Sequence, residues 1–250
     1  DGNTTGSSNT GVGYDAGGWT TGANSVAVGA SALAAATTGA NNVAVGKNAM
    51  MTQTSAGNNT GVGYGTLELN TSGADNVAIG YAALGANTTA SNNTAVGKNS
   101  LKANTTGADN VAIGYAAADA NTTGANNVAI GTSAFSVNTT GSQNVAIGDQ
   151  ALEANTTAAY NTAVGWKALT DNTTGASNTA LGHSALIANT TATNNTAVGY
   201  LALAANTTAT SNTAVGYRAL YANATGGTNN TAVGYDAGLS VATGVYNTYY

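Results

Sequence analysis

A short pattern, Asn-x-Ala-Val/Ile-Gly, recurs along this chain at a nearly constant period of seventeen residues. Its fourteen glycines are Gly13, Gly29, Gly46, Gly63, Gly80, Gly97, Gly114, Gly131, Gly148, Gly165, Gly182, Gly199, Gly216 and Gly234. All intervals between successive glycines equal this period, except that the first is one residue shorter and the last is one residue longer. Such regular spacing indicates one structural unit stacked on copies of itself. Residues 1–250 are therefore expected to form a single solenoid array of fourteen coils, from Gly13 to Gly234.

The composition favours a narrow core over a wide globular one. Hydrophobic residues make up 42% of the chain, but they are mostly Ala and Val, with one Phe and two Trp. The chain has no Pro, which suits continuous backbone ladders, and no Cys, which excludes disulfides and thiolate metal sites. A net charge of −5 with five basic residues disfavours nucleic acid as a partner. Apolar runs such as 32–36 are too short to span a bilayer.

Each coil is predicted to contain a short β-strand just before its glycine. Counting that glycine as position 0, position −4 is Asn in thirteen of fourteen copies, and positions −3 to −1 read Val/Thr, Ala/Gly and Val/Ile/Leu. β-Branched residues that alternate and end at Gly are typical of strands. After the glycine, Ala at +3, usually Leu at +4 and Asn-Thr-Thr from +7 predict a second short strand and a turn. The fold class is thus an all-β parallel β-solenoid, or β-roll, with one coil per sequence repeat.

The same pattern predicts which side chains face the core. We expect the aliphatic residues at −3, −1 and +4 to face inward, and the Asn residues at −4 and +7 to form amide ladders from coil to coil. The Ala at −2 would then point outward, and an outward position restricted to Ala or Gly suggests a second backbone packed against it. This predicts a homotrimer, intertwined or side by side, in which that strand lines a common axis. The alternative is a tight internal corner at −2.

Several motifs resemble those of a known family. They are Asn-Ser-Val-Ala-Val-Gly at 24–29, Asn-Val-Ala-Ile-Gly at 76–80 and 110–114, and Asn-Thr-Ala-Val-Gly at 93–97 and 195–199. These resemble the head repeats of YadA-like trimeric autotransporter adhesins, and the longer form at 195–208 is similar to phage tail-fibre-like and bacterial surface-fibre repeats. The resemblance covers the whole chain and implies trimeric, left-handed parallel β-rolls. The adhesin repeats are usually shorter, so each coil here carries an extra loop or corner.

An aromatic residue occupies position +1 in eight of the fourteen coils. These candidate ligand or stacking residues are Tyr14, Tyr64, Tyr81, Tyr115, Trp166, Tyr200, Tyr217 and Tyr235. They fit a stripe of rings that stabilises adjacent coils, which we favour, or a surface for sugars and other polar ligands.

The Asn-Thr-Thr segments at +7 also match the N-glycosylation sequon. The candidate sites are Asn70, Asn87, Asn104, Asn121, Asn138, Asn155, Asn172, Asn189, Asn206 and Asn223. The alternative is an Asn-Thr ladder that satisfies backbone groups at the turn. A sugar is wider than the strand spacing of about 4.8 Å, so modifying every coil would crowd the surface.

No pattern of catalytic or metal-binding residues recurs. Gly11 to Ala16 fits a loose dinucleotide motif but lacks the strand–helix context that the motif requires. The only histidine, His183, stands in the +1 slot and is interpreted as a ladder residue, and the carboxylates of Asp15, Glu68 and Asp149 show no repeating spacing. We therefore expect no enzyme, no cofactor and no metal site.

The sequence predicts a rigid extracellular fibre or adhesin shaft on a cell or virion surface. Its partners would be copies of itself and a host-surface or glycan ligand, with no nucleic acid and no membrane span. An ice-binding solenoid is the alternative function, although the adjacent Thr residues at +8 and +9 would point to opposite faces. The segments 1–17 and 235–250 are atypical flanking repeats, and the partial repeats at Asn3–Gly6 and Asn247–Thr248 suggest a piece of a longer fibre.

Overall fold

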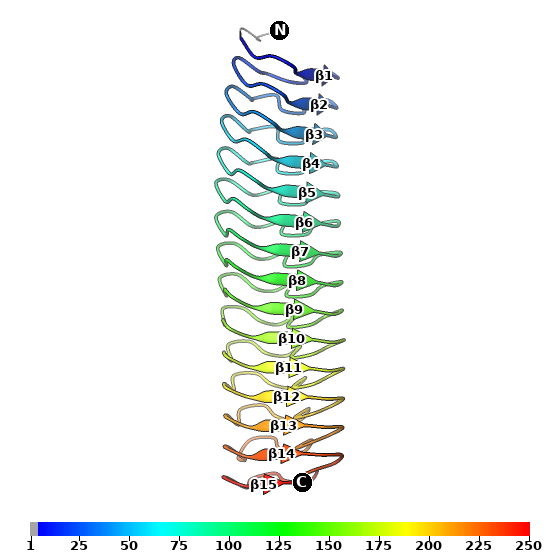
Figure 1. Ribbon diagram of the computed structural model, residues 1–250, viewed down its shortest axis with the longest axis vertical. Coiled ribbons are helices and arrows are strands. Elements are labelled where there is room, and N and C mark those ends of the chain that lie inside the picture. The colour runs from blue at the N-terminus through cyan, green and yellow to red at the C-terminus, as the bar shows by residue number, and fades with distance from the viewer. Residues whose placement is uncertain (1–4) are drawn as a thin grey trace. The chain divides into compact units, whose positions relative to one another are not determined.

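A computed structural model describes residues 5–250 and shows an all-β parallel solenoid with one coil per sequence repeat (Figure 1). The predicted partial repeat at 3–6 begins outside the described residues. The chain divides into an N-terminal unit ending at Asn126 and a C-terminal unit from Asn127 to Tyr250, which are described separately. Among the described residues there is no helix, and hence none that could cross a membrane.

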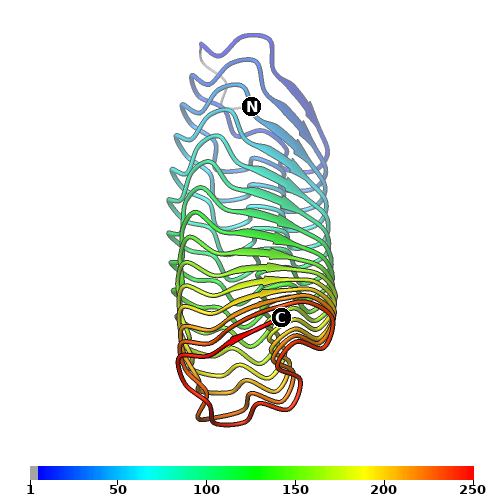
Figure 2. The ribbon, with the colours of Figure 1, turned by 60° about the horizontal axis from the view of Figure 1, so that its bottom comes forward.

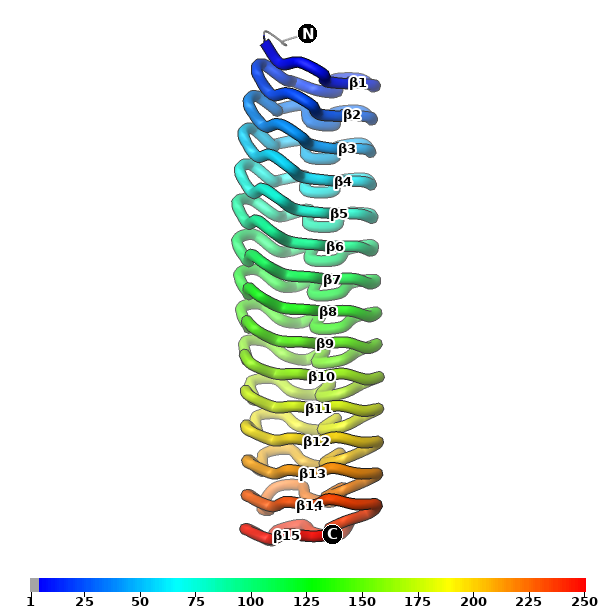
Figure 3. Tube along the Cα trace, in the orientation of Figure 1, coloured from blue at the N-terminus to red at the C-terminus, as the bar shows by residue number. Residues whose placement is uncertain are grey.

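Each coil contributes one strand to a parallel sheet. The N-terminal unit contains β1 (Thr10–Val12), β2 (Val26–Val28), β3 (Val43–Val45), β4 (Thr60–Val62), β5 (Val77–Ile79), β6 (Thr94–Val96) and β7 (Val111–Ile113). The C-terminal unit contains β8 (Val128–Ile130), β9 (Val145–Ile147), β10 (Thr162–Val164), β11 (Thr179–Leu181), β12 (Thr196–Val198), β13 (Thr213–Val215), β14 (Thr231–Val233) and β15 (Thr248–Tyr249). Within each unit every strand pairs with the next one in sequence, as the stacked arrows of Figure 1 and the tube of Figure 3 show.

Equivalent residues of neighbouring coils lie directly opposite each other. In the N-terminal unit Ala78 pairs with Ala95 and Ile79 with Val96, so the register repeats the sequence period. Position 0 must be glycine for a specific reason. Gly97 has φ +136°, and a Cβ there would overlap the carbonyl oxygen of Gly114 in the next coil. The invariant glycine is thus required by a close approach of two backbones.

The second strand predicted after the glycine is wrong. The structure has turns there, because residues at +2 and +4 adopt positive φ angles, such as 53° at Ala82 and 51° at Leu84. Two such residues fold the chain out of an extended path. Coil-to-coil hydrogen bonds persist nonetheless, for example from Leu84 N to Ser100 O at 3.1 Å. Figure 2 shows the strands along one side of each coil and the turns around the remainder.

The predicted orientation of the strand is also wrong. The Ala residues at −2 face inward and are fully buried, as at Ala78, Ala95 and Ala197. The residues at −3 and −1 face outward and remain partly exposed, as at Ile79. Only the Leu at +4 was placed correctly in the core. The interior is so narrow that Ala fills the core on the side of the strand. Because the Ala at −2 does not point outward, it no longer supports a trimer.

The predicted columns of Asn side chains at −4 and +7 run through each unit, and the structure shows that they are buried. At +7 the amides bond to one another, and Asn87 Nδ2 lies 2.8 Å from Asn70 Oδ1. At −4 some amides also bond to one another, as Asn76 Nδ2 does to Asn59 Oδ1 at 3.2 Å, and the side chains bond to the backbone as well. Asn59 Oδ1 accepts a bond of 2.9 Å from the backbone N of Asn76, and Asn76 Nδ2 donates to Ala90 O, further along the chain, at 2.9 Å. The −4 column therefore both links successive coils and closes each one.

The +7 column starts where the residue at +7 changes from Ala36 to Gln53, and it stops where the period changes. It begins at Gln53, whose Oε1 accepts a bond of 3.2 Å from Asn70 Nδ2. In the C-terminal unit, the longer final interval moves Asn223, whose Nδ2 donates to Gly227 O at 2.8 Å. Asn206 Oδ1 is consequently buried without a hydrogen-bond partner. One inserted residue thus ends the ladder.

Candidate functional site

The sheet carries an outward apolar surface in each unit, which we call the outward sheet face. It consists of the −3 and −1 side chains of the strands, and the exposed fractions at −1 include 40% for Ile79, 39% for Ile113 and 47% for Leu181. These two positions hold Val, Thr, Ile or Leu in all fourteen coils and never a charged residue. The structure therefore exposes large aliphatic side chains and buries small ones, the reverse of an ordinary sheet with one solvated face.

The aromatic residues at +1 form a ladder of rings, which are stacked between the tyrosines and tilted by 37° on either side of His183. In the C-terminal unit the rings of Trp166, His183, Tyr200, Tyr217 and Tyr235 follow one another with centroid distances of 4.6, 5.1, 5.3 and 4.9 Å. His183 is part of this stack, as its interpretation as a ladder residue requires. The stack is favourable through ring packing between successive coils.

The N-terminal unit carries a shorter version of the same ladder. Tyr64 and Tyr81 stack with centroids 5.3 Å apart, and Lys98 Nζ then lies 5.9 Å from the Tyr81 ring and 5.8 Å from the Tyr115 ring. A lysine between two tyrosines continues the column through cation–π contacts. Tyr14, by contrast, is 85% exposed and has no ring beside it among the described residues.

The stacking limits what the ladder can bind. Two atoms in contact are about 3.5–4.0 Å apart, so rings about 5 Å apart leave no room for a third ring between their faces. Only the ring edges and the phenol hydroxyls remain available along the column. A sugar that lies flat on an aromatic face would need a ring outside the ladder.

All ten candidate glycosylation asparagines are buried, with exposed fractions of 0 or 1%. Their side-chain nitrogens all donate hydrogen bonds inside the fold; Asn104 Nδ2, for example, donates to Asn87 Oδ1 at 3.1 Å and to Gly107 O at 2.9 Å. A glycan on such a nitrogen is incompatible with this packing. The neighbouring Thr hydroxyls at +8 bond to the next coil, as Thr88 Oγ1 does to Thr105 O at 3.0 Å. The Asn-Thr-Thr segment therefore serves the fold.

The titratable residues form no metal-like cluster. Among residues 5–250, no group of three or more His, Asp or Glu side chains could hold a metal ion. One carboxyl group has a shifted pKa: partial burial raises the pKa of Asp119 above 3.8, against the opposing effects of backbone hydrogen bonds and the charge of Lys102.

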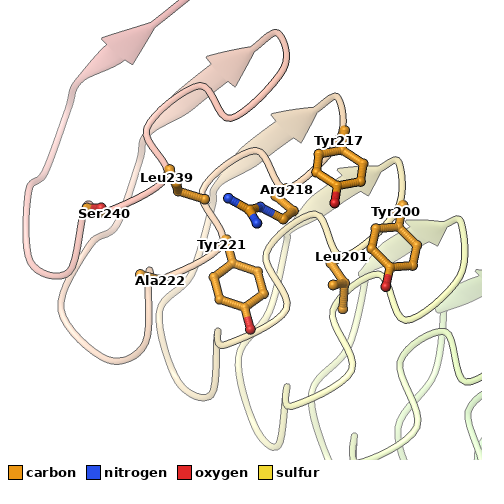
Figure 4. A pocket seen from close by; sticks show the side chains of 8 residues that line it. All are labelled: Tyr200, Leu201, Tyr217, Arg218, Tyr221, Ala222, Leu239 and Ser240. Atoms are coloured by element: carbon orange, nitrogen blue, oxygen red, sulfur yellow. The ribbon is translucent and has the colours of Figure 1, made fainter.

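A hollow of about 420 Å³ lies beside the aromatic ladder in the C-terminal unit (Figure 4). We call it the tyrosine–arginine hollow, and it is lined by Tyr200, Leu201, Tyr217, Arg218, Tyr221, Ala222, Leu239 and Ser240. Arg218 Nε and Nη2 donate to the two carboxylate oxygens of Asp236 at 3.0 and 3.1 Å. Desolvation acts to lower the pKa of Arg218, but the hydrogen bond and charge of Asp236 outweigh it, so the pKa is raised.

Sequence reasoning placed Tyr200 and Tyr217 on the ladder but missed the hollow, because it assigned no role to Arg218, Tyr221 or Leu239. One signal was present: Tyr221 is the only aromatic residue at +5 in the fourteen coils. In comparisons with known proteins, no family model, no curated protein and no solved structure matches this chain. The resemblance to adhesin and tail-fibre repeats therefore stays a prediction.

Proposed function

We propose that this chain is a structural fibre segment on the outside of a cell or virion, and that copies of it associate side by side through the outward sheet face. The observation that carries the proposal is the uninterrupted, uncharged surface at −3 and −1, which is Val, Ile or Leu at −1 and Val or Thr at −3 in every coil. The trimeric state follows from the resemblance to adhesin head repeats. The correction of the strand orientation moves the expected interface from the −2 column to the −3 and −1 columns.

The size of this surface supports association. Seven strands spaced by about 4.8 Å give a strip about 30 Å long in the N-terminal unit, and its two columns lie about 7 Å apart. Each unit then exposes an apolar area on the order of 300 Å², which is the size at which exposed patches on soluble proteins tend to be functional.

The regularity of the surface favours a copy of the same chain as the partner. The side chains at −3 and −1 repeat at the strand spacing, so that Ile79 lies beside Val96 and Val96 lies beside Ile113 in successive strands. A partner with the same spacing can interdigitate over every coil, whereas a globular partner would match only a few. The absence of charge in both columns means that identical faces do not repel each other.

The interior suits a mechanical role. Each coil is bound to the next by strand pairing, by turn hydrogen bonds and by the two Asn columns, so little of the backbone is free to open. A chain stabilised by neighbour-to-neighbour contacts is stiff along its stacking direction. No cluster of catalytic residues competes with this role among the described residues, and we retain the expectation that the chain is not an enzyme.

The test is a variant that makes the outward sheet face charged. Replacing Ile79 and Ile113 together by Lys should dissociate the assembly, while the coils keep their circular dichroism spectrum. The matched control replaces Thr89 and Thr106, exposed residues at +9, by Lys and should leave the assembly intact. An Ile79→Lys/Ile113→Lys variant with the mass of the unmodified assembly would refute the proposed interface.

Ice binding is the second candidate, and the corrected orientation favours it more than the sequence did. In β10 to β15 position −3 is Thr in every strand, and it shares the outward face with the −1 residue. The six Thr residues are Thr162, Thr179, Thr196, Thr213, Thr231 and Thr248. This makes a regular array of hydroxyl and methyl groups on one side of the sheet.

Both functions use the outward sheet face, but only one of them allows chains to cover it, so an experiment can distinguish them. A fibre buries the outward sheet face between chains, whereas an ice-binding solenoid must leave it in water. Thermal hysteresis by a monomeric chain would favour ice binding. An assembled chain without hysteresis at about 1 mM would dismiss it.

A further inference from the structure

We propose that the tyrosine–arginine hollow binds a neutral pyranose sugar, as one or two rings of a glycan. The hollow lies at positions +1, +2, +5 and +6 of the coils, and none of these belongs to the outward sheet face. The proposal therefore goes beyond the structural role and does not depend on self-association. It would give a uniform array of repeats one place of specific attachment.

The shape of the hollow suits a ring with apolar faces. Figure 4 shows Tyr221 on one side and the ladder rings of Tyr200 and Tyr217 on the other, with Leu201 between them. Its volume of about 420 Å³ falls in the range of small-ligand sites. Tyr221 stands at +5, outside the ladder, so its ring is not stacked between two others and is 39% exposed. It supplies the free aromatic surface that the ladder rings lack.

The polar groups of the hollow suit hydroxyl groups of a sugar. The phenol oxygens of Tyr200, Tyr217 and Tyr221 point the same way in Figure 4 and make no hydrogen bond within the described part of the chain. Phenol groups both donate and accept, as sugar hydroxyls do. Arg218 closes one end, with its guanidinium carbon 5.5 Å from the Tyr217 ring centre and 5.8 Å from that of Tyr221.

The charge balance favours a neutral ligand. Asp236 occupies Nε and Nη2 of Arg218 and neutralises the only positive charge that lines the hollow. The remaining guanidinium nitrogen, Nη1, keeps its hydrogens available to an uncharged acceptor. A carboxylate or phosphate would instead have to compete with Asp236 for the same cation.

A second hollow in the N-terminal unit shows what is specific to this one. It has a volume of about 340 Å³ and is formed at the same +2, +5 and +6 positions, by residues that include Glu68, Leu69 and Lys102. It contains no aromatic side chain. A groove at these positions thus occurs in both units, and the rings and the Arg–Asp pair distinguish the hollow at Tyr200 to Ser240 from the other.

The test is a titration of the whole chain, observed by saturation-transfer NMR. The neutral probes are methyl glucopyranoside, lactose and diacetylchitobiose, each up to about 10 mM, and sialyllactose is the charged probe. At least one neutral probe should bind saturably. Tyr221→Ala should weaken that binding about tenfold or more. The control Tyr64→Ala, a Tyr of similar exposure at 44% in the N-terminal unit, should leave it unchanged.

Three results would overturn the proposal. They are no saturable binding of any neutral probe, binding that Tyr221→Ala leaves unchanged, or binding of sialyllactose alone. Circular dichroism and the solution mass of Tyr221→Ala establish that the variant is folded and assembled as the parent chain is. Loss of sugar binding at unchanged mass separates this proposal from the fibre proposal, whose interface lies elsewhere on the coil.

Discussion

Removal of one amide from the +7 ladder tests whether the buried Asn column holds the coils together. Asn87 Nδ2 donates to Asn70 Oδ1 at 2.8 Å and to Ala90 O at 3.0 Å. Its own Oδ1 accepts a bond of 3.1 Å from Asn104 Nδ2. The side chain has no exposed surface, so water cannot replace these partners in the folded chain.

The expected loss follows from the groups that Asn87→Ala would leave unpaired. Asn70 Oδ1 loses its acceptor bond, and one N–H of Asn104 loses its partner, although the other still donates to Gly107 O at 2.9 Å. Ala90 O keeps the bond of 2.9 Å from Asn76. Two orphaned buried groups at about 1–3 kcal/mol each predict a destabilisation of about 2–6 kcal/mol.

Urea denaturation followed by circular dichroism measures this change in the free energy of unfolding. Thr89→Ala is the matched control, because Thr89 lies two residues away and its side chain is exposed. The control should change stability by less than about 0.5 kcal/mol. If Asn87→Ala fell within that same range, the ladder would be a by-product of stacking and the reasoning would be refuted.

Three further substitutions test the packing and the electrostatics. Ala95→Leu should destabilise the chain by at least about 1–3 kcal/mol, because the buried −2 site has no room for the larger side chain. Its control, Val96→Leu on the outward face, should change stability little. Equal effects of the two variants in thermal melts would contradict the assigned orientation of the strand. Gly97→Ala should destabilise the chain by more than about 1–3 kcal/mol, which is the cost of the backbone strain alone. The added Cβ would also overlap a backbone oxygen of the next coil. Gly85→Ala, whose Cβ would lie 3.3 Å from its nearest neighbour, should have a small effect in the same assay. Because burial raises the pKa of Asp119 above 3.8, its charged form opposes folding at neutral pH and this cost disappears as the pH falls through the folded pKa to below 3.8. Asp119→Asn should therefore be more stable than the parent at pH 7 but not below pH 3.8, and an unchanged difference across that range would count against the burial effect.

The repeat period was sufficient to predict the parallel solenoid and the Asn ladders, but not that the Asn side chains are buried. A constant spacing forces equivalent residues into register, and an amide stacked on its own copy can bond in only a few ways, as Asn70 and Asn87 do. The period alone did not predict the number of strands in a coil. A positive φ is unfavourable for a residue such as Leu84, so the local sequence does not predict the turn that Leu84 forms.

The orientation of the strand was mispredicted for a related reason. Val-Ala-Val presents apolar residues on both faces, and the usual rule places the larger ones inside. Here the turns bring the opposite wall so close that Ala78 and Ala95 already fill the strand side of the core, and the wall supplies Leu84 and Leu101. Alternation identified the two faces correctly, but the width of the coil determined which one is buried.

The candidate sites were predictable to different extents. Stacking at +1 followed directly from the register, because one aromatic per period places the rings of Tyr200 and Tyr217 side by side. The glycosylation sites were predicted from a motif that can be modified only where its Asn is exposed, and Asn87 is buried. The tyrosine–arginine hollow required knowing that +1, +2 and +5 border one groove, which turn geometry sets and composition does not.

The central claim is that the outward sheet face joins copies of this chain. Sedimentation equilibrium of the unmodified chain tests it most directly, because the method measures mass independently of shape. The chain has a mass of 24.1 kDa, and a trimer predicts three times that value. A mass of 24.1 kDa throughout the micromolar range would contradict the claim and leave the outward sheet face open to water.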